Sequence, residues 1–211
     1  MILIVPSFFW VVLEMSTINS YRLNFYGPKK LNGKDTVFYK VGSEFFISSN
    51  KDTTGLEPFT IDTLDYPIYA LMFIKKAYNE DTYRIGGLVE YLNYKKEKIG
   101  HIPFFLITEF ANKESFIQNN LTKLSENKNV NFLNVPANKF DSLNFTYFIE
   151  KPVYIDYSFF VLVDQNRHIR GYYDGRYASE VKRLTDEFKH LRLKEAKQKL
   201  IQENEIKRSQ K

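Results

Sequence analysis

The sequence contains no cysteine among its 211 residues. This excludes disulfide exchange, thiol peroxidase chemistry, thiolate metal binding and cysteine-based nucleophilic catalysis. Histidine is scarce, and His101, His168 and His190 are far apart in sequence, so a shared metal site would require them to converge in the fold. The motifs GxSxG, HExxH, GxxxxGK[ST] and GxGxxG do not occur. The sequence therefore does not indicate an enzyme.

The apolar run at the N-terminus is too short to cross a bilayer. It extends from Ile2 to Leu13, is interrupted by Pro6 and Ser7, and as a helix would reach about 18 Å, against the roughly 30 Å of a bilayer core. No Lys or Arg precedes the run and no small-x-small site follows it, so it does not match a cleaved signal peptide. A truncated anchor and a buried N-terminal helix both stay open.

The composition is that of one globular domain with a basic C-terminal part. Hydrophobic residues make up 44% of the chain, which is ample for a core, and the net charge is +5. From Gln165 onward, thirteen Lys or Arg face seven Asp or Glu, a surplus of six. Interleaved charges such as KEAKQK, residues 194–199, are typical of a solvated helix face. A basic helix that binds anionic lipid or nucleic acid is a weaker hypothesis, and no zinc-finger spacing, Arg-rich run or RNA-binding aromatic motif supports nucleic acid.

The middle of the chain alternates between apolar runs and helical patterns. The expected order is a strand, a helix, a strand, a helix and a strand, over Ile68–Ile74, Ile85–Lys96, Ile102–Thr108, Glu114–Glu126 and Val130–Val135. Gly86 and Gly87 weaken the first helix. This order predicts parallel strands joined by helices, with Ile68–Ile74 at the centre. Functional residues in such folds lie where strands end and helices begin, and residues 78–82 occupy that place.

The flanking segments are less regular. Before the central strand, Leu31–Lys40 and Glu44–Ser48 are predicted to pair as an N-terminal hairpin. Pro58–Ile61 fits a short strand or a turn, and Pro136–Pro152 shows too little periodicity to be assigned.

The end of the chain is the most informative. Apolar residues ending at Asp164, a polar turn and a second extended run from Ile169 to Tyr173 predict a β-hairpin. A helix is then expected from the N-cap Ser179, with one buried stripe of apolar residues at 181, 184, 188 and 191. A thioredoxin-like domain ends with this order of elements: a strand, a turn, a second strand and a helix.

The stretch FVLVDQNRHIRGYYDG, Phe160–Gly175, resembles the SCO/SenC family, in which LVD, a short turn, IRG and YYDG recur in this order. These proteins are membrane-tethered thioredoxin-fold copper chaperones that help assemble cytochrome c oxidase. Residues Phe25–Lys29, FYGPK, are similar to the aromatic-Gly-Pro lead into the soluble domain of such proteins from Bacteroidetes-like bacteria. The resemblance implies an α/β, thioredoxin-like fold with an N-terminal β-hairpin extension and a long C-terminal helix. It also implies an anchor in residues 1–19, a domain over 20–192 and a charged helical extension over 193–211.

The resemblance also locates a copper site whose ligands are missing. The family's Cys-x-x-x-Cys pair would fall at Tyr78 and Thr82, and its histidine at Asp156. A phenol, a hydroxyl and a carboxylate form a hard oxygen set that does not select Cu(I), so neither a metal nor another cofactor is expected. The favoured interpretation is that Tyr78 packs, Thr82 caps a helix and Asp156 is solvated. The alternative is a remodelled pocket in which these oxygens bind a metal or small molecule.

The function expected from the resemblance is that of a non-catalytic, membrane-anchored protein of respiratory oxidase assembly. Its soluble domain would lie on the periplasmic side of a bacterial inner membrane and would dock a protein partner, without nucleic acid. An enzyme or metal protein built on Tyr78, Thr82 and Asp156 is the second hypothesis. A basic domain that binds anionic lipid or nucleic acid through its C-terminal helix is the third.

Overall fold

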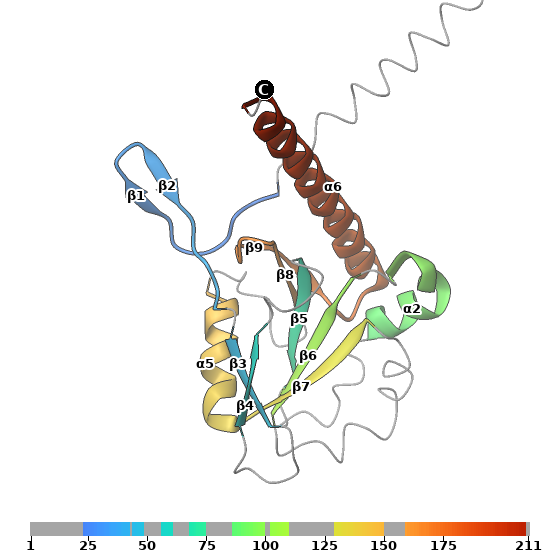
Figure 1. The fold of residues 1–211 in the computed structure, drawn as a ribbon. Coiled ribbons are helices and arrows are strands. Elements are labelled where there is room, and N and C mark those ends of the chain that lie inside the picture. Colours follow the sequence, from blue (N-terminus) through green and yellow to red (C-terminus); the bar gives the residue numbers. More distant parts are fainter. Residues whose placement is uncertain are drawn as a thin grey trace, which may run out of the picture.

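The computed structural model describes residues 23–42, 44–48, 56–60, 68–74, 86–99, 102–109, 129–149 and 159–209. A five-stranded sheet with the order β7-β6-β5-β8-β9 forms its centre (Figure 1). The five strands are β5 (Tyr69–Ile74), β6 (Phe104–Glu109), β7 (Val130–Val135), β8 (Phe159–Val163) and β9 (Ile169–Asp174). β5, β6 and β7 are parallel, whereas β8 is antiparallel to both β5 and β9. The prediction that Ile68–Ile74 contains the central strand is confirmed.

β5 is buried on both faces because helices cover the sheet on both sides. Its sequence, YALMFI, is therefore continuously apolar rather than alternating. Ala70 and Met72 point into the core beneath α2 (Gly86–Ile99) and α6 (Ala178–Ser209). Leu71 and Phe73 point into the opposite core, which α5 (Ala137–Tyr147) covers. The two-residue side-chain period of a strand thus divides one apolar run between two cores.

The predicted N-terminal hairpin is wrong in its pairing. β1 (Lys30–Asn32) pairs with β2 (Asp35–Val37), so both strands of the hairpin lie within the segment predicted as one strand. The turn begins at Gly33, whose φ of 64° is in the left-handed region that glycine adopts without a steric penalty. β3 (Glu44–Ser48) pairs instead with β4 (Leu56–Thr60). The segment Pro58–Ile61, for which a short strand and a turn were both open, therefore begins within a strand.

Two helices differ from their sequence expectations. α5 occupies the segment that could not be assigned. Phe140 and Tyr147 are buried there and the helical residues between them are exposed or half-buried, so the apolar period is weak. α6 begins at Ala178, and the carbonyl of Tyr177 accepts the N–H groups of Glu180 and Val181. Ser179 therefore lies inside the first turn and is not the N-cap. The predicted helix Glu114–Glu126 lies outside the described residues.

α6 runs without a break from Ala178 to Ser209 and crosses positions 192 and 193, where the domain was expected to give way to an extension. The stripe predicted to be buried is confirmed by Val181, Leu184, Phe188 and Leu191. Within the described ranges, no helix is both long and apolar enough to span a membrane.

Candidate functional site

The three degenerate ligand positions, Tyr78, Thr82 and Asp156, lie outside the described residues, as does His101. The elements that flank them are described. β5 ends at Ile74 and α2 begins at Gly86, so Tyr78 and Thr82 fall between these two elements, and Asp156 precedes β8.

One edge of the sheet, here called the site edge, collects the ends of three strands. β5 and β8 run in opposite directions, so the carboxyl end of β5 at Ile74 lies at the same edge as the amino end of β8 at Phe159. Phe159 in turn pairs with Asp174 at the carboxyl end of β9. The YYDG part of the sequence motif therefore lies at the edge where β5 ends and β8 begins.

Gly87, in the first turn of α2, allows this helix to pack directly on the turn that follows β9. The Gly87 N–H donates a 2.9 Å hydrogen bond to the carbonyl of Gly175. A Cβ on Gly87 would overlap the carbonyl carbon of Tyr177 and lie 2.6 Å from its backbone nitrogen, whereas a Cβ on Gly86 would have no neighbour closer than 3.9 Å. Gly87 thus lowers helix propensity but permits a close approach that no other residue allows.

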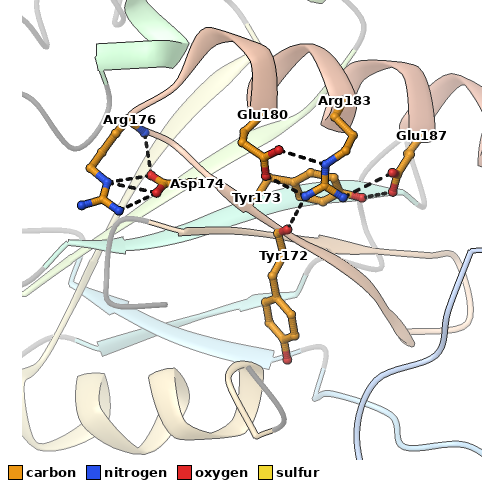
Figure 2. A network of polar contacts seen from close by, with 7 residues as sticks. All are labelled: Tyr172, Tyr173, Asp174, Arg176, Glu180, Arg183 and Glu187. Carbon is orange, nitrogen blue, oxygen red and sulfur yellow. Dashed lines mark hydrogen bonds and ion pairs between the residues drawn. The ribbon is translucent and has the colours of Figure 1, made fainter. Parts of the chain in front are cut away.

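Asp174 fixes the turn that follows β9 (Figure 2). Its buried carboxylate accepts the backbone N–H of Arg176 at 3.0 Å and the Arg176 Nε at 2.9 Å. Its backbone carbonyl accepts the N–H of Tyr177 at 3.2 Å. The Asp-Gly pair of the motif is therefore a structural turn that sets the start of α6 and the position of α2.

Tyr173 and Arg183 join α6 to β9 (Figure 2). The Tyr173 hydroxyl donates a 2.5 Å hydrogen bond to Glu187, and the Arg183 guanidinium lies 4.4 Å from the centre of the Tyr173 ring. Arg183 also donates to the carbonyl of Tyr172 at 2.9 Å and to Glu180 at 2.7 Å. Burial, together with the Glu187 carboxylate, raises the pKa of Tyr173 well above its usual value. The phenol therefore stays protonated at neutral pH and serves as a donor rather than as a nucleophile.

At the opposite edge, the LVD and IRG segments form a buried ion pair. Asp164 accepts the N–H groups of Asn166 and His168, each at 2.9 Å, and the Arg170 guanidinium at 2.9 Å. Arg170 uses its remaining donors on the carbonyls of Leu23 and Asn24 at 2.7 and 3.1 Å. Because both charges are buried and each of the three guanidinium nitrogens donates a hydrogen bond, Asp164 and Arg170 lock the hairpin turn and bind the N-terminal segment to it.

The aromatic-Gly-Pro lead is held on this same hairpin. The Phe25 ring lies 3.9 Å from the Arg170 guanidinium, and the Tyr26 N–H donates to the Ile169 carbonyl at 3.1 Å. Gly27 has a φ of 101°, and a Cβ there would lie 2.5 Å from the Cβ of Tyr39. The two segments that carry the family resemblance, 146 positions apart between Asn24 and Arg170, therefore form one structural unit.

The two described histidines do not form a metal site. His168 lies edge-on to the rings of Phe25 and Phe38, with centroids at 5.2 and 6.1 Å. Burial lowers its pKa, and Asp164 only partly opposes this effect, so the imidazole is neutral at pH 7. His190 lies on α6. In the described part of the chain, no three His, Asp or Glu side chains are placed to hold a metal ion together.

No family model matches the chain, and no curated protein matches it. Its fold is similar to that of a SCO1/SenC family lipoprotein from Bacillus anthracis str. Ames, with 19% identity over 70% of this chain and 92% of that one and a TM-score of 0.52. Apo Sco1 from Thermus thermophilus matches with 13% identity over 80% of this chain and 98% of that one, at a TM-score of 0.46. The thioredoxin domain of a thiol-disulfide oxidoreductase from Bacteroides vulgatus matches with 15% identity over 61% and 86%, at 0.37.

The expected fold class is confirmed. The chain has a thioredoxin-like fold, similar to that of the SCO1/SenC family lipoprotein, with an N-terminal β-hairpin and a long C-terminal helix.

Proposed function

We propose that the chain is a non-catalytic SCO/SenC-like protein that takes part in the assembly of a respiratory cytochrome oxidase without binding copper itself. In this proposal residues 1–19 anchor it to a bacterial inner membrane, and the thioredoxin-like domain of residues 20–192 works on the periplasmic side. Residues 193–211 form a charged helical extension of that domain.

One observation supports the proposal above all: the two segments that resemble the SCO/SenC family, Phe25–Lys29 and Phe160–Gly175, lie against each other near the Asp164–Arg170 ion pair. The N-terminal lead and the hairpin meet through contacts that depend on residues of the motif itself. A general thioredoxin-like fold would not require these residues in both places. The likeness in fold to a SCO1/SenC family lipoprotein, over 92% of that protein, supports the same conclusion.

The chemistry of the chain argues for a role without copper. Thiolate transfer of Cu(I) requires soft sulfur ligands, and the sequence contains no cysteine. The side chains that replace the family's ligands, Tyr78, Thr82 and Asp156, offer only oxygen atoms. A domain that keeps the architecture and lacks the ligands is suited to docking a partner of the assembly process rather than to carrying the metal.

The site edge supplies a residue suited to docking. Tyr177, the second residue after the YYDG motif, is 56% exposed although the backbone around it is fixed by Asp174 and Gly87. An exposed aromatic side chain on a rigid turn loses little conformational entropy when it is buried by a partner.

The test is to extract the tagged full-length protein from membranes and identify the proteins that accompany it. We expect oxidase subunits, copper proteins or assembly factors, and a loss of these when Tyr177 is replaced by Ala. Phe145→Ala is the matched control, because Phe145 is 71% exposed and lies on α5, away from the site edge. Retrieval of none of these proteins by the wild-type chain would contradict the assembly role.

A further inference from the structure

The second half of α6 extends beyond the core. Its buried residues end at Leu191, yet the helix continues to Ser209, and Figure 1 shows this part running past the sheet. From Arg192 to Ser209 every residue except Glu195 is exposed. About five helical turns are therefore available to contact another surface.

The outward face of this extension combines exposed leucines with basic side chains. Leu193 and Leu200 are 73% and 60% exposed, and their spacing of seven residues places them on one face of the helix. Exposed lysines at 189, 197 and 207 lie on the same face. Successive residues are rotated by about 100° around the helix axis. In this projection, no acidic residue from Lys189 onward lies within about 60° of the direction in which the two leucines point.

The acidic residue nearest the core faces the other way. Glu195 accepts the backbone N–H of Gln165 at 3.5 Å and so points toward the turn between β8 and β9. Burial raises its pKa to about 7, which reduces the negative charge that it adds at neutral pH. Of the remaining acidic residues of the extension, Glu203 lies about 70° from the centre of the leucine face and Glu205 lies about 130° from it, on the far side of the helix.

This extension leaves the fold beside the β8–β9 hairpin, to which the first described residues of the chain are also bound. Arg170 binds the carbonyl of Leu23, and Leu23 is the first described residue after the N-terminal segment. The turn that Glu195 approaches belongs to the same hairpin as Arg170. The β1–β2 hairpin also projects from this end (Figure 1) and adds lysines at 29, 30 and 34.

We infer that the leucine and lysine face of α6, between Lys189 and Arg208, lies on the surface of an anionic lipid bilayer. The inference rests on the proposed anchoring and extends it to a second contact with the membrane. Leucines on the contact face bury in the apolar boundary of the bilayer, and the surrounding lysines pair with lipid phosphates. A nucleic acid would pair with the lysines but would leave the leucines without an apolar phase.

The absence of cysteine makes a direct test possible. A polarity-sensitive fluorophore is attached to the full chain at Leu200→Cys, or at Phe145→Cys as the matched exposed control on α5. Vesicles consist of phosphatidylcholine alone or of phosphatidylcholine mixed with phosphatidylglycerol. We expect a blue shift at position 200 that requires phosphatidylglycerol and weakens with salt, and no such shift at position 145.

The charge contribution is tested with the triple variant K189Q/K197Q/K207Q. At about fivefold in affinity per basic residue, it should lower the phosphatidylglycerol-dependent partition about 100-fold. An unchanged emission at position 200 with anionic vesicles would overturn the inference. So would a shift that appears without vesicles and grows with protein concentration, because that result indicates a second copy of the chain on this face.

The proposed anchor has a separate readout. Flotation of the chain with vesicles of phosphatidylcholine alone depends on residues 1–19 and not on lysine charge. Failure to float there contradicts the anchor, whereas the phosphatidylglycerol-dependent shift tests only α6.

Discussion

Gly86 and Gly87 are adjacent in one helix, and the structure predicts opposite results for the same substitution. Gly87→Ala places a methyl group against the backbone of Tyr177, whereas a methyl group at Gly86 meets nothing closer than 3.9 Å. Overpacking of this kind costs about 1–3 kcal/mol, and the gain in helix propensity from Gly to Ala returns about 0.5–1 kcal/mol. We therefore expect a net loss of about 1–2 kcal/mol for Gly87→Ala and a gain of up to about 1 kcal/mol for Gly86→Ala.

The assay is urea unfolding of the full chain followed by far-ultraviolet circular dichroism, with thermal unfolding as a second measure. For a chain of this size, a loss of about 1–2 kcal/mol corresponds to a Tm lower by roughly 2–8 °C. Each variant is the control for the other, because both replace glycine by alanine in the same helix and only Gly87→Ala adds a close contact with Tyr177. Equal stabilisation by both substitutions would refute the close approach between α2 and the turn after β9.

Two further predictions concern groups at the opposite edge of the sheet. Asp164→Ala should lower the free energy of unfolding by about 3–5 kcal/mol because it leaves the buried Arg170 without its carboxylate. The double variant with Arg170→Met should lose less free energy of unfolding than the two single variants together. Strict additivity in urea unfolding would show that the two side chains do not interact. Glu195 has a folded pKa of about 7 against an ordinary value of 4.5, so the folded state holds the extra proton and stability should fall as pH rises between these values. Glu195→Gln should remove this fall and Glu205→Gln should not; an identical pH dependence in all three proteins would contradict the burial of Glu195 against the turn.

The sequence predicted elements whose apolar pattern is strong. Four such elements have a clear apolar run or a clear helical period. They are the central strand, the strand Val130–Val135, the closing hairpin and the buried stripe of α6. α5 was not predicted, because the few residues that it buries leave a weak apolar period. The N-terminal pairing was wrong because the turn at Gly33 divides a segment whose β-forming residues read as one strand.

The location expected for the site stays a prediction, because Tyr78, Thr82 and Asp156 lie outside the described residues. The order of strands and helices indicated the carboxyl end of the central strand, and the structure adds that the Asp174-Gly175 turn belongs to that edge. From the sequence, the only effect expected of Gly87 was a lower helix propensity. Its close approach to Tyr177 could not be predicted, because that backbone lies ninety positions later in the chain. The pairing of Arg170 with Asp164 had a signal, two opposite charges that flank a short turn, whereas its contact with Leu23 had none.

We propose that the chain serves oxidase assembly by contact with a partner and not by supplying copper. The most direct measurement is cytochrome c oxidase activity in membranes from cells that lack the chain, grown with and without added copper. Excess copper can offset a missing carrier of the ion but cannot replace a missing docking surface. We predict a loss of oxidase activity that added copper does not restore; full activity without the chain, or recovery with copper, would contradict the claim.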